Sequence, residues 1–323
     1  MNKDKDKDKD KDKDKDKDKD NYIFLYFNSW GGTYDQSLYL KTPLTQIAKT
    51  FHIFTIGFQL YGGVDSYKIP LNVSPQNPIF KQTIINLFKK VLNQLIEEIN
   101  KILETYPNHK IVLMSHSLGY SLLFYILFNS QLMKHIDRCK NIILLDPAGW
   151  SVNEKERKIN SETYGKYIIQ FQTFNKGSNG SNGNVFKEWR QFMFDSTKPQ
   201  FTNDEKKTGM YQYIIDGNCN SQLDLSIYTY AIDYYPIDKL ILYITHKYPK
   251  LIYLLTSSNG LAYQNINYWK QLGIKNIEIV STSGHFLYIF SQLSTIKHIY
   301  AILNKKPKYI QLYGTNYNNP INN

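Results

Sequence analysis

The segment 110–128, KIVLMSHSLGYSLLFYILF, constrains the fold more than any other part of the sequence. It opens with the apolar run Ile111–Met114, which is typical of a strand buried on both faces of a parallel sheet. From Leu118 onward, apolar residues recur at helical spacing and no proline interrupts them. The pentapeptide 115–119 (SHSLG) joins the two halves, with small residues on both sides of Ser117. The segment therefore predicts a strand that turns directly into a helix.

The tight bend predicted at Ser117 has chemical consequences. A large neighbouring side chain would clash across such a bend, which explains the small residues around it. The bend lifts the Ser117 hydroxyl clear of the sheet. It also leaves the N–H of Leu118 at a helix N-terminus, where developing negative charge is stabilised. Ser117 is therefore our candidate nucleophile, and the backbone of Leu118 is a candidate oxyanion donor.

The pentapeptide resembles the nucleophile elbow G-x-S-x-G of the α/β-hydrolases, with Ser115 in place of the first glycine. The N-terminal part resembles the same family in its order of an apolar strand, a Gly-bearing loop, a helix and a second strand. In the family the first loop reads His-Gly-x, and its third residue donates a second oxyanion N–H. Trp30 occupies that place here. The resemblance implies the α/β-hydrolase fold, a mostly parallel sheet flanked by helices, lacking the usual first two strands and carrying a helical cap insertion.

Composition shifts divide the chain into four parts. Residues 1–20 hold a strict Lys-Asp alternation with nothing apolar to bury, so we expect them to be disordered. Residues 21–150 and 249–310 alternate strands with helices, which is typical of an α/β core with a parallel sheet. Residues 151–248 are polar, irregular and rich in aromatics, and we interpret them as the cap insertion. Its aromatic side chains either build a small core of their own or line an acyl pocket. Residues 311–323 form a polar tail.

A serine nucleophile needs a general base, and the sequence offers seven histidines. Only His285 follows the last predicted strand at its carboxyl end, the edge at which open α/β sheets bind ligands. The segment Gly284-His285-Phe286 also resembles the catalytic histidine loop of the α/β-hydrolases. His116 lies inside the elbow, where we expect it to point away from Ser117. We therefore predict His285 as the base.

The third member of a triad is left open by the sequence. In the family the acid usually follows the strand before the last helix–strand unit, where this chain has Asn259 and no carboxylate. Asp146 ends the strand beside the elbow strand, about 4.8 Å away, and LDPAG at 145–149 resembles lipases that take their acid there. In other family members this aspartate only anchors its loop. Asp146 is the first candidate, with Asn259 as a degraded third member or a cap carboxylate such as Asp224 or Asp233 as alternatives.

Charge and composition limit the classes of partner. The net charge is +11, and it lies in the folded part because the Lys-Asp repeat cancels itself. This surplus of positive charge allows weak contact with anionic membranes. The sequence has no basic run interleaved with aromatics, the pattern that would indicate nucleic-acid binding. No apolar run reaches membrane-spanning length, and the charged N-terminus has no signal-peptide character. Cys139 and Cys219 have no metal-binding spacing. We expect a cytoplasmic protein without metal or cofactor, and the sequence does not determine its oligomeric state.

These features predict a serine hydrolase that cleaves a small-molecule carboxylic ester or thioester through an acyl-enzyme. Acyl transfer to an acceptor other than water would use the same residues. A binding or scaffold protein with a degenerate hydrolase fold is the alternative from another class. It is favoured by the departures from the family pattern at 28–29, Ser115, Tyr120 and Asn259.

Overall fold

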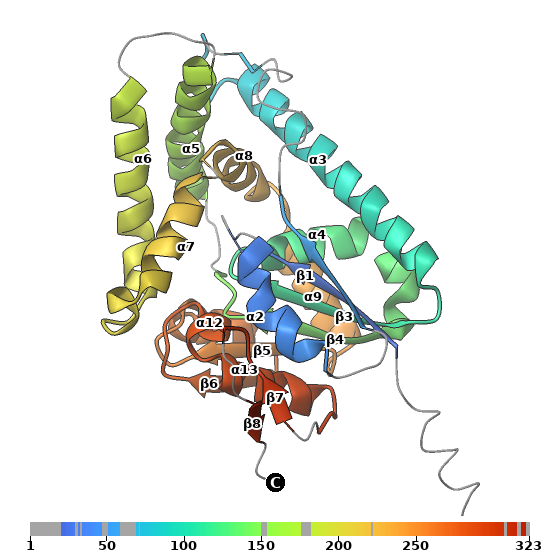
Figure 1. Ribbon diagram of the computed structural model, residues 1–323. Coiled ribbons are helices and arrows are strands. Elements are labelled where there is room, and N and C mark those ends of the chain that lie inside the picture. The colour runs from blue at the N-terminus through green and yellow to red at the C-terminus, as the bar shows by residue number, and fades with distance from the viewer. Residues whose placement is uncertain are drawn as a thin grey trace, which may run out of the picture.

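The computed structural model describes residues 21–29, 32, 34–46, 51–58, 69–70, 72–149, 154–175, 182–220, 222–306, 309–314 and 318–320. The Lys-Asp repeat, Trp30 and most of the loop after the second strand lie outside these ranges. Within them, a six-stranded sheet forms the centre of the molecule, and all of its strand pairs are parallel (Figure 1).

The strands of this sheet are β1 (Tyr22–Phe27), β2 (Phe51–Ile56), β3 (Lys110–His116), β4 (Cys139–Leu145), β5 (Ile252–Ser257) and β6 (Asn276–Ser281). The helices of the α/β core are α2 (Tyr34–Leu44), α3 (Pro78–Thr105), α4 (Gly119–Asn129), α9 (Ile237–Lys247), α10 (Leu261–Gln264), α11 (Ile266–Gln271), α12 (Leu287–Phe290) and α13 (Gln292–Ile302), with the 3₁₀ segment η2 (Gln131–Arg138). The order across the sheet is β2-β1-β3-β4-β5-β6, so the elbow strand β3 lies at its middle.

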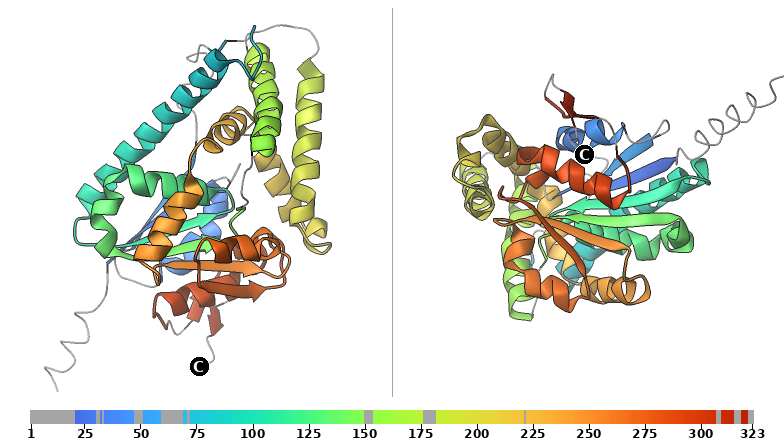
Figure 2. Two further views of the ribbon diagram at one scale, coloured as in Figure 1. Left: turned by 180° about the vertical axis from the view of Figure 1, so that it is seen from behind. Right: turned by 90° about the horizontal axis from the view of Figure 1, so that it is seen from below.

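Both faces of the sheet are buried, which explains the unbroken apolar runs of its central strands. Successive residues of β1 alternate between two hydrophobic cores: Phe24 belongs to one and Leu25 to the other. The first core contains residues of α2, α12 and α13, and the second contains residues of α3, α4, α9 and α11. Figure 2 shows these helices on opposite sides of the twisted sheet. The predicted fold class is confirmed.

The long helix α3 links the sheet to the region above it. The Asn77 side chain caps it by accepting a hydrogen bond from the N–H of Ile79 at 2.8 Å, and Pro78 occupies its first turn. Its later residues, such as Leu92, pack on the sheet, whereas Phe80 near its start contacts the ring of Tyr230 outside the sheet. The helix therefore extends beyond the core and supports the inserted helices.

Within the described residues, four helices and two 3₁₀ turns lie between β4 and α9, and we call them the helical insertion. They are α5 (Glu154–Asn175), α6 (Asn182–Thr197), η3 (Lys198–Gln200), η4 (Glu205–Lys207), α7 (Gly209–Asn220) and α8 (Gln222–Ile232). In Figure 1, α5 and α6 lie side by side above the sheet and α8 lies between α5 and α3. Trp189 is fully buried against Tyr167, Phe171 and Phe192, with ring centroids 4.9–5.6 Å apart. These aromatics pack on one another and belong to the same hydrophobic cluster as one face of the sheet.

Several boundaries differ from those the sequence suggests. The helix α9 falls inside the predicted cap range 151–248, yet its buried residues pack in the core with α4. The sequence of residues 287–303 predicts one closing helix, but the structure divides it at Ser291, whose φ of −128° and ψ of 42° are not helical. Part of the predicted polar tail forms the strand β8 (Asn318–Pro320), which pairs antiparallel with β7 (Tyr309–Gln311).

Candidate active site

The structure forms a tight bend at Ser117, between β3 and α4. Ser117 has a φ of 52°, in the left-handed region that a residue with a side chain enters at a cost of about 1–3 kcal/mol. Its N–H donates to the carbonyl of Leu145 at 3.2 Å, which ties the bend to the end of β4. The helix α4 begins two residues later, with Leu118 as its N-cap. The bend therefore has the strand–turn–helix context expected of a nucleophile elbow.

Gly119 permits the close packing of this bend. A Cβ atom there would lie 2.4 Å from the carbonyl oxygens of both Phe27 and Asn28. The loop after β1 therefore presses directly on the first turn of α4. Asn28 shapes that loop, because its Oδ1 accepts from the N–H of Ser29 at 3.1 Å and its Nδ2 donates to the carbonyl of Gly32 at 2.7 Å.

Asp146 lies directly after β4, fully buried and with a φ of 40°. Its Oδ1 accepts from the Thr256 hydroxyl at 2.5 Å and from the N–H of Ala262 at 3.0 Å. Its Oδ2 accepts from the N–H of Leu261 at 2.9 Å. Gly260 allows this arrangement, since a Cβ there would lie 2.3 Å from Oδ1. The carboxylate is thus held in one orientation by donors from β5 and the start of α10.

The imidazole of His285 completes the surroundings of this carboxylate. Its Nδ1 lies 2.6 Å from Oδ2 of Asp146, and both side chains are at most 1% exposed. Because ionised Asp accepts only, Nδ1 carries the proton and Nε2 is left as the acceptor. A base with this tautomer is able to take a proton from a serine hydroxyl. His285 and Ser117 line the same cavity.

The backbone around His285 is held as firmly as its ring. Its N–H donates to the carbonyl of Gln200 at 2.8 Å, and its carbonyl accepts from Nε2 of His116 at 3.0 Å. The rings of His116 and His285 lie 4.5 Å apart. Burial lowers the pKa of His116 well below its usual value, with a further contribution from His285. His116 is therefore a neutral donor beneath the base, a position that the sequence did not indicate.

A cavity of about 110 Å³ is lined by Ser117 and His285, and we call it the Ser117 cavity. Leu118, Ala148 and Phe286 contribute apolar surface, whereas Asn160 and Asp233 contribute polar groups from the insertion side. Nδ2 of Asn160 donates to Oδ2 of Asp233 at 2.7 Å, and burial raises the pKa of this carboxyl. The core therefore contributes both the polar groups of Ser117 and His285 and apolar surface, and the insertion adds a hydrogen-bonded carboxyl–amide pair.

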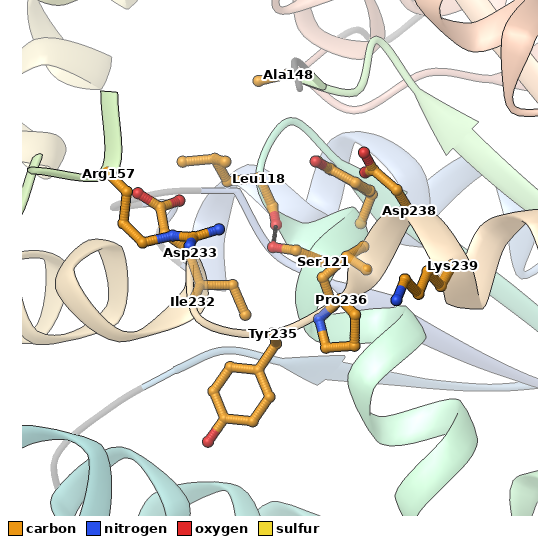
Figure 3. Close-up of a pocket in the computed structure, with 12 residues that line it drawn as sticks. Leu118, Ser121, Ala148, Arg157, Ile232, Asp233, Tyr235, Pro236, Asp238 and Lys239 are labelled. Carbon is orange, nitrogen blue, oxygen red and sulfur yellow. Dashed lines mark hydrogen bonds between the residues drawn. The ribbon is translucent and has the colours of Figure 1, made fainter. Parts of the chain in front are cut away.

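A second cavity of about 240 Å³ adjoins the first, and we call it the Arg157 cavity (Figure 3). The two share Leu118, Ala148, Ile232 and Asp233 as lining residues. Figure 3 shows Arg157 beside Asp233, and the positive charge of Arg157 opposes the rise in the pKa of that carboxyl. Space therefore continues past Ser117 toward α9.

Other residues predicted for the site lie elsewhere. Asn259 is exposed and its Nδ2 donates to the carbonyl of Thr282 at 2.6 Å, whereas Asp146 occupies Nδ1 of His285. Asp224 lines a different cavity, beside Asn28 and Tyr228. Asp233 does line the Ser117 cavity, where its carboxylate accepts from Asn160. Trp30, the predicted second oxyanion donor, lies outside the described residues.

Two contacts of this site were missed by sequence reasoning. Thr256 holds Asp146, and no local pattern in β5 distinguishes it from an ordinary strand residue. Glu205 of the insertion accepts from the N–H of Gly284 at 2.8 Å. The spacing Thr202-x-x-Glu205 is a capping-box pattern that would have indicated a local role for this glutamate.

Searches for two further kinds of site gave negative results for the described ranges. No group of three or more His, Cys, Asp or Glu side chains there is arranged to hold a metal ion. Among the helices described, none combines the length and the apolar character needed to cross a bilayer.

Comparisons with known proteins agree with this architecture. No protein-family model matches the sequence, and no curated protein matches it either. Solved structures do match: MenH from S. aureus has a TM-score of 0.55 at 12% identity, covering 88% of this chain and 94% of that one. A thermophilic esterase from Thermogutta terrifontis has a TM-score of 0.54 at 11% identity, covering 88% and 89%. A bromoperoxidase from Bacillus anthracis has a TM-score of 0.53 at 11% identity, covering 88% and 92%.

These neighbours share the central sheet and its flanking helices with this chain over most of their length. The resemblance first noted at the pentapeptide 115–119 therefore extends to the whole architecture, while the low identities say nothing of the reaction. This chain has the α/β-hydrolase fold.

Proposed function

We propose that this protein is a serine hydrolase that cleaves a carboxylic ester or thioester of a small molecule. The observation on which the proposal depends is the 2.6 Å contact between Asp146 and His285, whose imidazole lines the same cavity as Ser117. A binding module would have no need for a buried imidazole–carboxylate pair next to a strained serine.

In the proposed reaction, the Ser117 hydroxyl attacks the carbonyl carbon while Nε2 of His285 takes its proton. Asp146 accepts from Nδ1 and stabilises the imidazolium that forms. The tetrahedral intermediate collapses as the imidazolium returns the proton to the leaving alcohol or thiol. Water, activated by the same imidazole, then releases the acid from the acyl-enzyme.

The negative charge on the tetrahedral intermediate requires hydrogen-bond donors beside Ser117. We assign the N–H of Leu118 at the start of α4 as one donor and retain the backbone of Trp30 as the second. The Ser29 hydroxyl is a further donor, because it is buried in the cavity wall and has no partner among the described residues. One such donor contributes about 3–4 kcal/mol to the transition state in known enzymes.

The two cavities suggest where the parts of a substrate lie. The Ser117 cavity of about 110 Å³ suits a short acyl group. The Arg157 cavity offers both charged and aromatic groups to a larger, more polar leaving group. Transfer of the acyl group to an acceptor in the Arg157 cavity would use the same first step, and the products distinguish it from hydrolysis.

A fluorophosphonate probe tests the proposal, because it reacts covalently only with an activated serine. We expect the wild type to gain the mass of one probe per chain, Ser117→Ala to gain none, and His285→Gln to be labelled only at a slow residual rate. Ser258→Ala is the control, since this serine follows β5 and does not line the Ser117 cavity. A wild type that labels no faster than Ser117→Ala would refute the hydrolase and favour the binding module.

Ester hydrolysis gives the second measurement. p-Nitrophenyl esters of increasing acyl length should show the highest kcat/KM for short chains, as the size of the Ser117 cavity implies. Rates independent of acyl length would contradict the placing of the acyl group in that cavity.

A further inference from the structure

The peptide groups on both sides of His285 are fixed by contacts from four separate elements: β3, β5, η3 and η4. The carbonyl of Gly284 accepts from the Ser257 hydroxyl at 3.0 Å, and the carbonyl of His285 accepts from His116 at 3.0 Å. Both of these donors belong to the sheet. The N–H groups of the same two residues donate instead to the insertion, to Glu205 and to the carbonyl of Gln200, each at 2.8 Å.

Glu205 is the charged member of this set. Its side chain is buried, although it comes from a short polar turn between α6 and α7. Oε1 accepts from the N–H of Gly284 and Oε2 accepts from the N–H of Thr202, both at 2.8 Å. The carboxylate thus uses one oxygen to close its own turn and the other to hold the loop of the base. Hydrogen bonds to a charged acceptor are about twice as strong as neutral ones.

The turn that contains Glu205 also reaches the Ser117 cavity. Gln200, three residues after α6 ends, lines that cavity and accepts from His285. The ring of Phe201 stacks on Phe286 with centroids 5.0 Å apart and an interplanar angle of 14°. Residues 198–205 therefore contact the cavity, the backbone of the base and the ring after it.

We propose that Glu205 is a positioning residue that couples the helical insertion to the catalytic base. The position of the insertion would then set the distance from Nε2 of His285 to the hydroxyl of Ser117. The proposal rests on the hydrolase function proposed above. Asp146 fixes the direction of the imidazole, but the distance from Nε2 to Ser117 depends on the main chain at residues 284–285. A displacement of about 1 Å at a reacting group costs on the order of a hundredfold in rate.

Glu205→Ala is the direct test, measured as the rate constant of fluorophosphonate labelling at Ser117. We expect this rate to fall by about tenfold to a hundredfold, because the N–H of Gly284 loses its acceptor and the loop relaxes. Glu205→Gln retains one acceptor oxygen for Gly284. We expect it to be labelled at least fivefold faster than Glu205→Ala. Asp204→Ala removes the neighbouring carboxylate, whose side chain is 94% exposed, and should change the rate less than twofold.

The His285→Ala background separates positioning from general damage to the fold. Without an imidazole to position, Glu205→Ala should lower the residual labelling rate less than twofold, measured at higher probe concentration. A similar loss in both backgrounds would overturn the proposal, and so would a Glu205→Ala rate equal to that of the wild type. If Glu205→Ala does not fold, Glu205→Gln is compared in the two backgrounds by the same criteria.

A wild type that does not react with the probe overturns the hydrolase function and the coupling together. A reactive wild type with an unaffected Glu205→Ala overturns only the coupling. The two failures are therefore distinguishable in one series of measurements.

Discussion

Two buried carboxylates from different regions hold the loop of His285, and they act on different parts of it. Asp146, from the core, contacts the imidazole ring itself and is held by donors from β5 and α10. Glu205, from the insertion, contacts only the backbone N–H of Gly284 and belongs to a turn of three helical residues. Under the proposed function, the core would set the chemistry of the base through Asp146, and the insertion would set the position of its backbone through Glu205.

The difference between the two regions has a physical origin. Asp146 follows a central strand whose neighbours leave it little freedom, so its geometry is built into the sheet. Glu205 depends on how four helices pack above that sheet. Substitutions at Asp146 should therefore lower turnover far more than stability. Substitutions around Glu205 should lower turnover less, by an amount that depends on how the insertion packs.

The largest expected effect is that of Asp146→Asn. The amide still fills the space, but it does not stabilise the imidazolium and favours the wrong tautomer of His285. We expect kcat/KM for ester hydrolysis to fall by about four orders of magnitude, as in the corresponding serine-protease change given as a general example. A loss below tenfold would show that the acid is elsewhere and would remove the contrast with Glu205.

Two glycines give a matched test of the comparison. A Cβ at Gly260 would lie 2.3 Å from Oδ1 of Asp146, and a Cβ at Gly284 would lie 2.3 Å from the carbonyl of Gln200. Gly260→Ala displaces a carboxylate fixed by the sheet, so we expect kcat/KM to fall about a hundredfold. Gly284→Ala pushes on the insertion, which is able to yield, so its loss should be smaller. Equal losses in steady-state assays would contradict a more rigid core.

Thr256→Val tests whether the hydrogen-bond donors around Asp146 contribute to turnover. Valine keeps the shape of the side chain but removes the hydroxyl that lies 2.5 Å from Oδ1. Loss of a hydrogen bond to a charged group costs about 1.5–3 kcal/mol, and part of this cost should appear as a decrease of about tenfold in kcat/KM. Thr245→Val is the control, because that hydroxyl bonds the carbonyl of Leu272, away from the Ser117 cavity. Similar losses in both variants would contradict the role of Thr256.

The smallest expected effect is a change in how the stability of the protein depends on pH when His116 is replaced. Burial depresses the pKa of His116 in the folded protein, whereas the unfolded chain has the ordinary pKa of about 6.5. Below pH 6.5 the unfolded state therefore binds more protons, and stability falls by at most about 1.4 kcal/mol per pH unit until the folded pKa is reached. His116→Gln removes this contribution. The drop in Tm between pH 7 and pH 5.5 should be smaller in the variant, and an equal drop would contradict a neutral buried His116.

Much of the core followed from local patterns. The apolar run 22–27 and the run opening at Ile111 predicted strands because residues buried on both faces show no polar alternation. The small residues around Ser117 predicted the bend, and Gly119 proves to be sterically required there. Helix interruptions were not predictable in the same way. At Ser291 the composition remains helical, and no local pattern marks the break between α12 and α13.

The sequence by itself determined the order of strands and helices, the bend at Ser117 and the candidacy of Asp146 and His285, because these depend on residues adjacent in the chain or on neighbouring strands. Only the tertiary structure decided which carboxylate meets the imidazole, that His116 supports it from below and that Glu205 holds its loop. These contacts join residues separated by 79 to 169 positions. Such pairings are set by the packing of whole elements, and no local pattern encodes them.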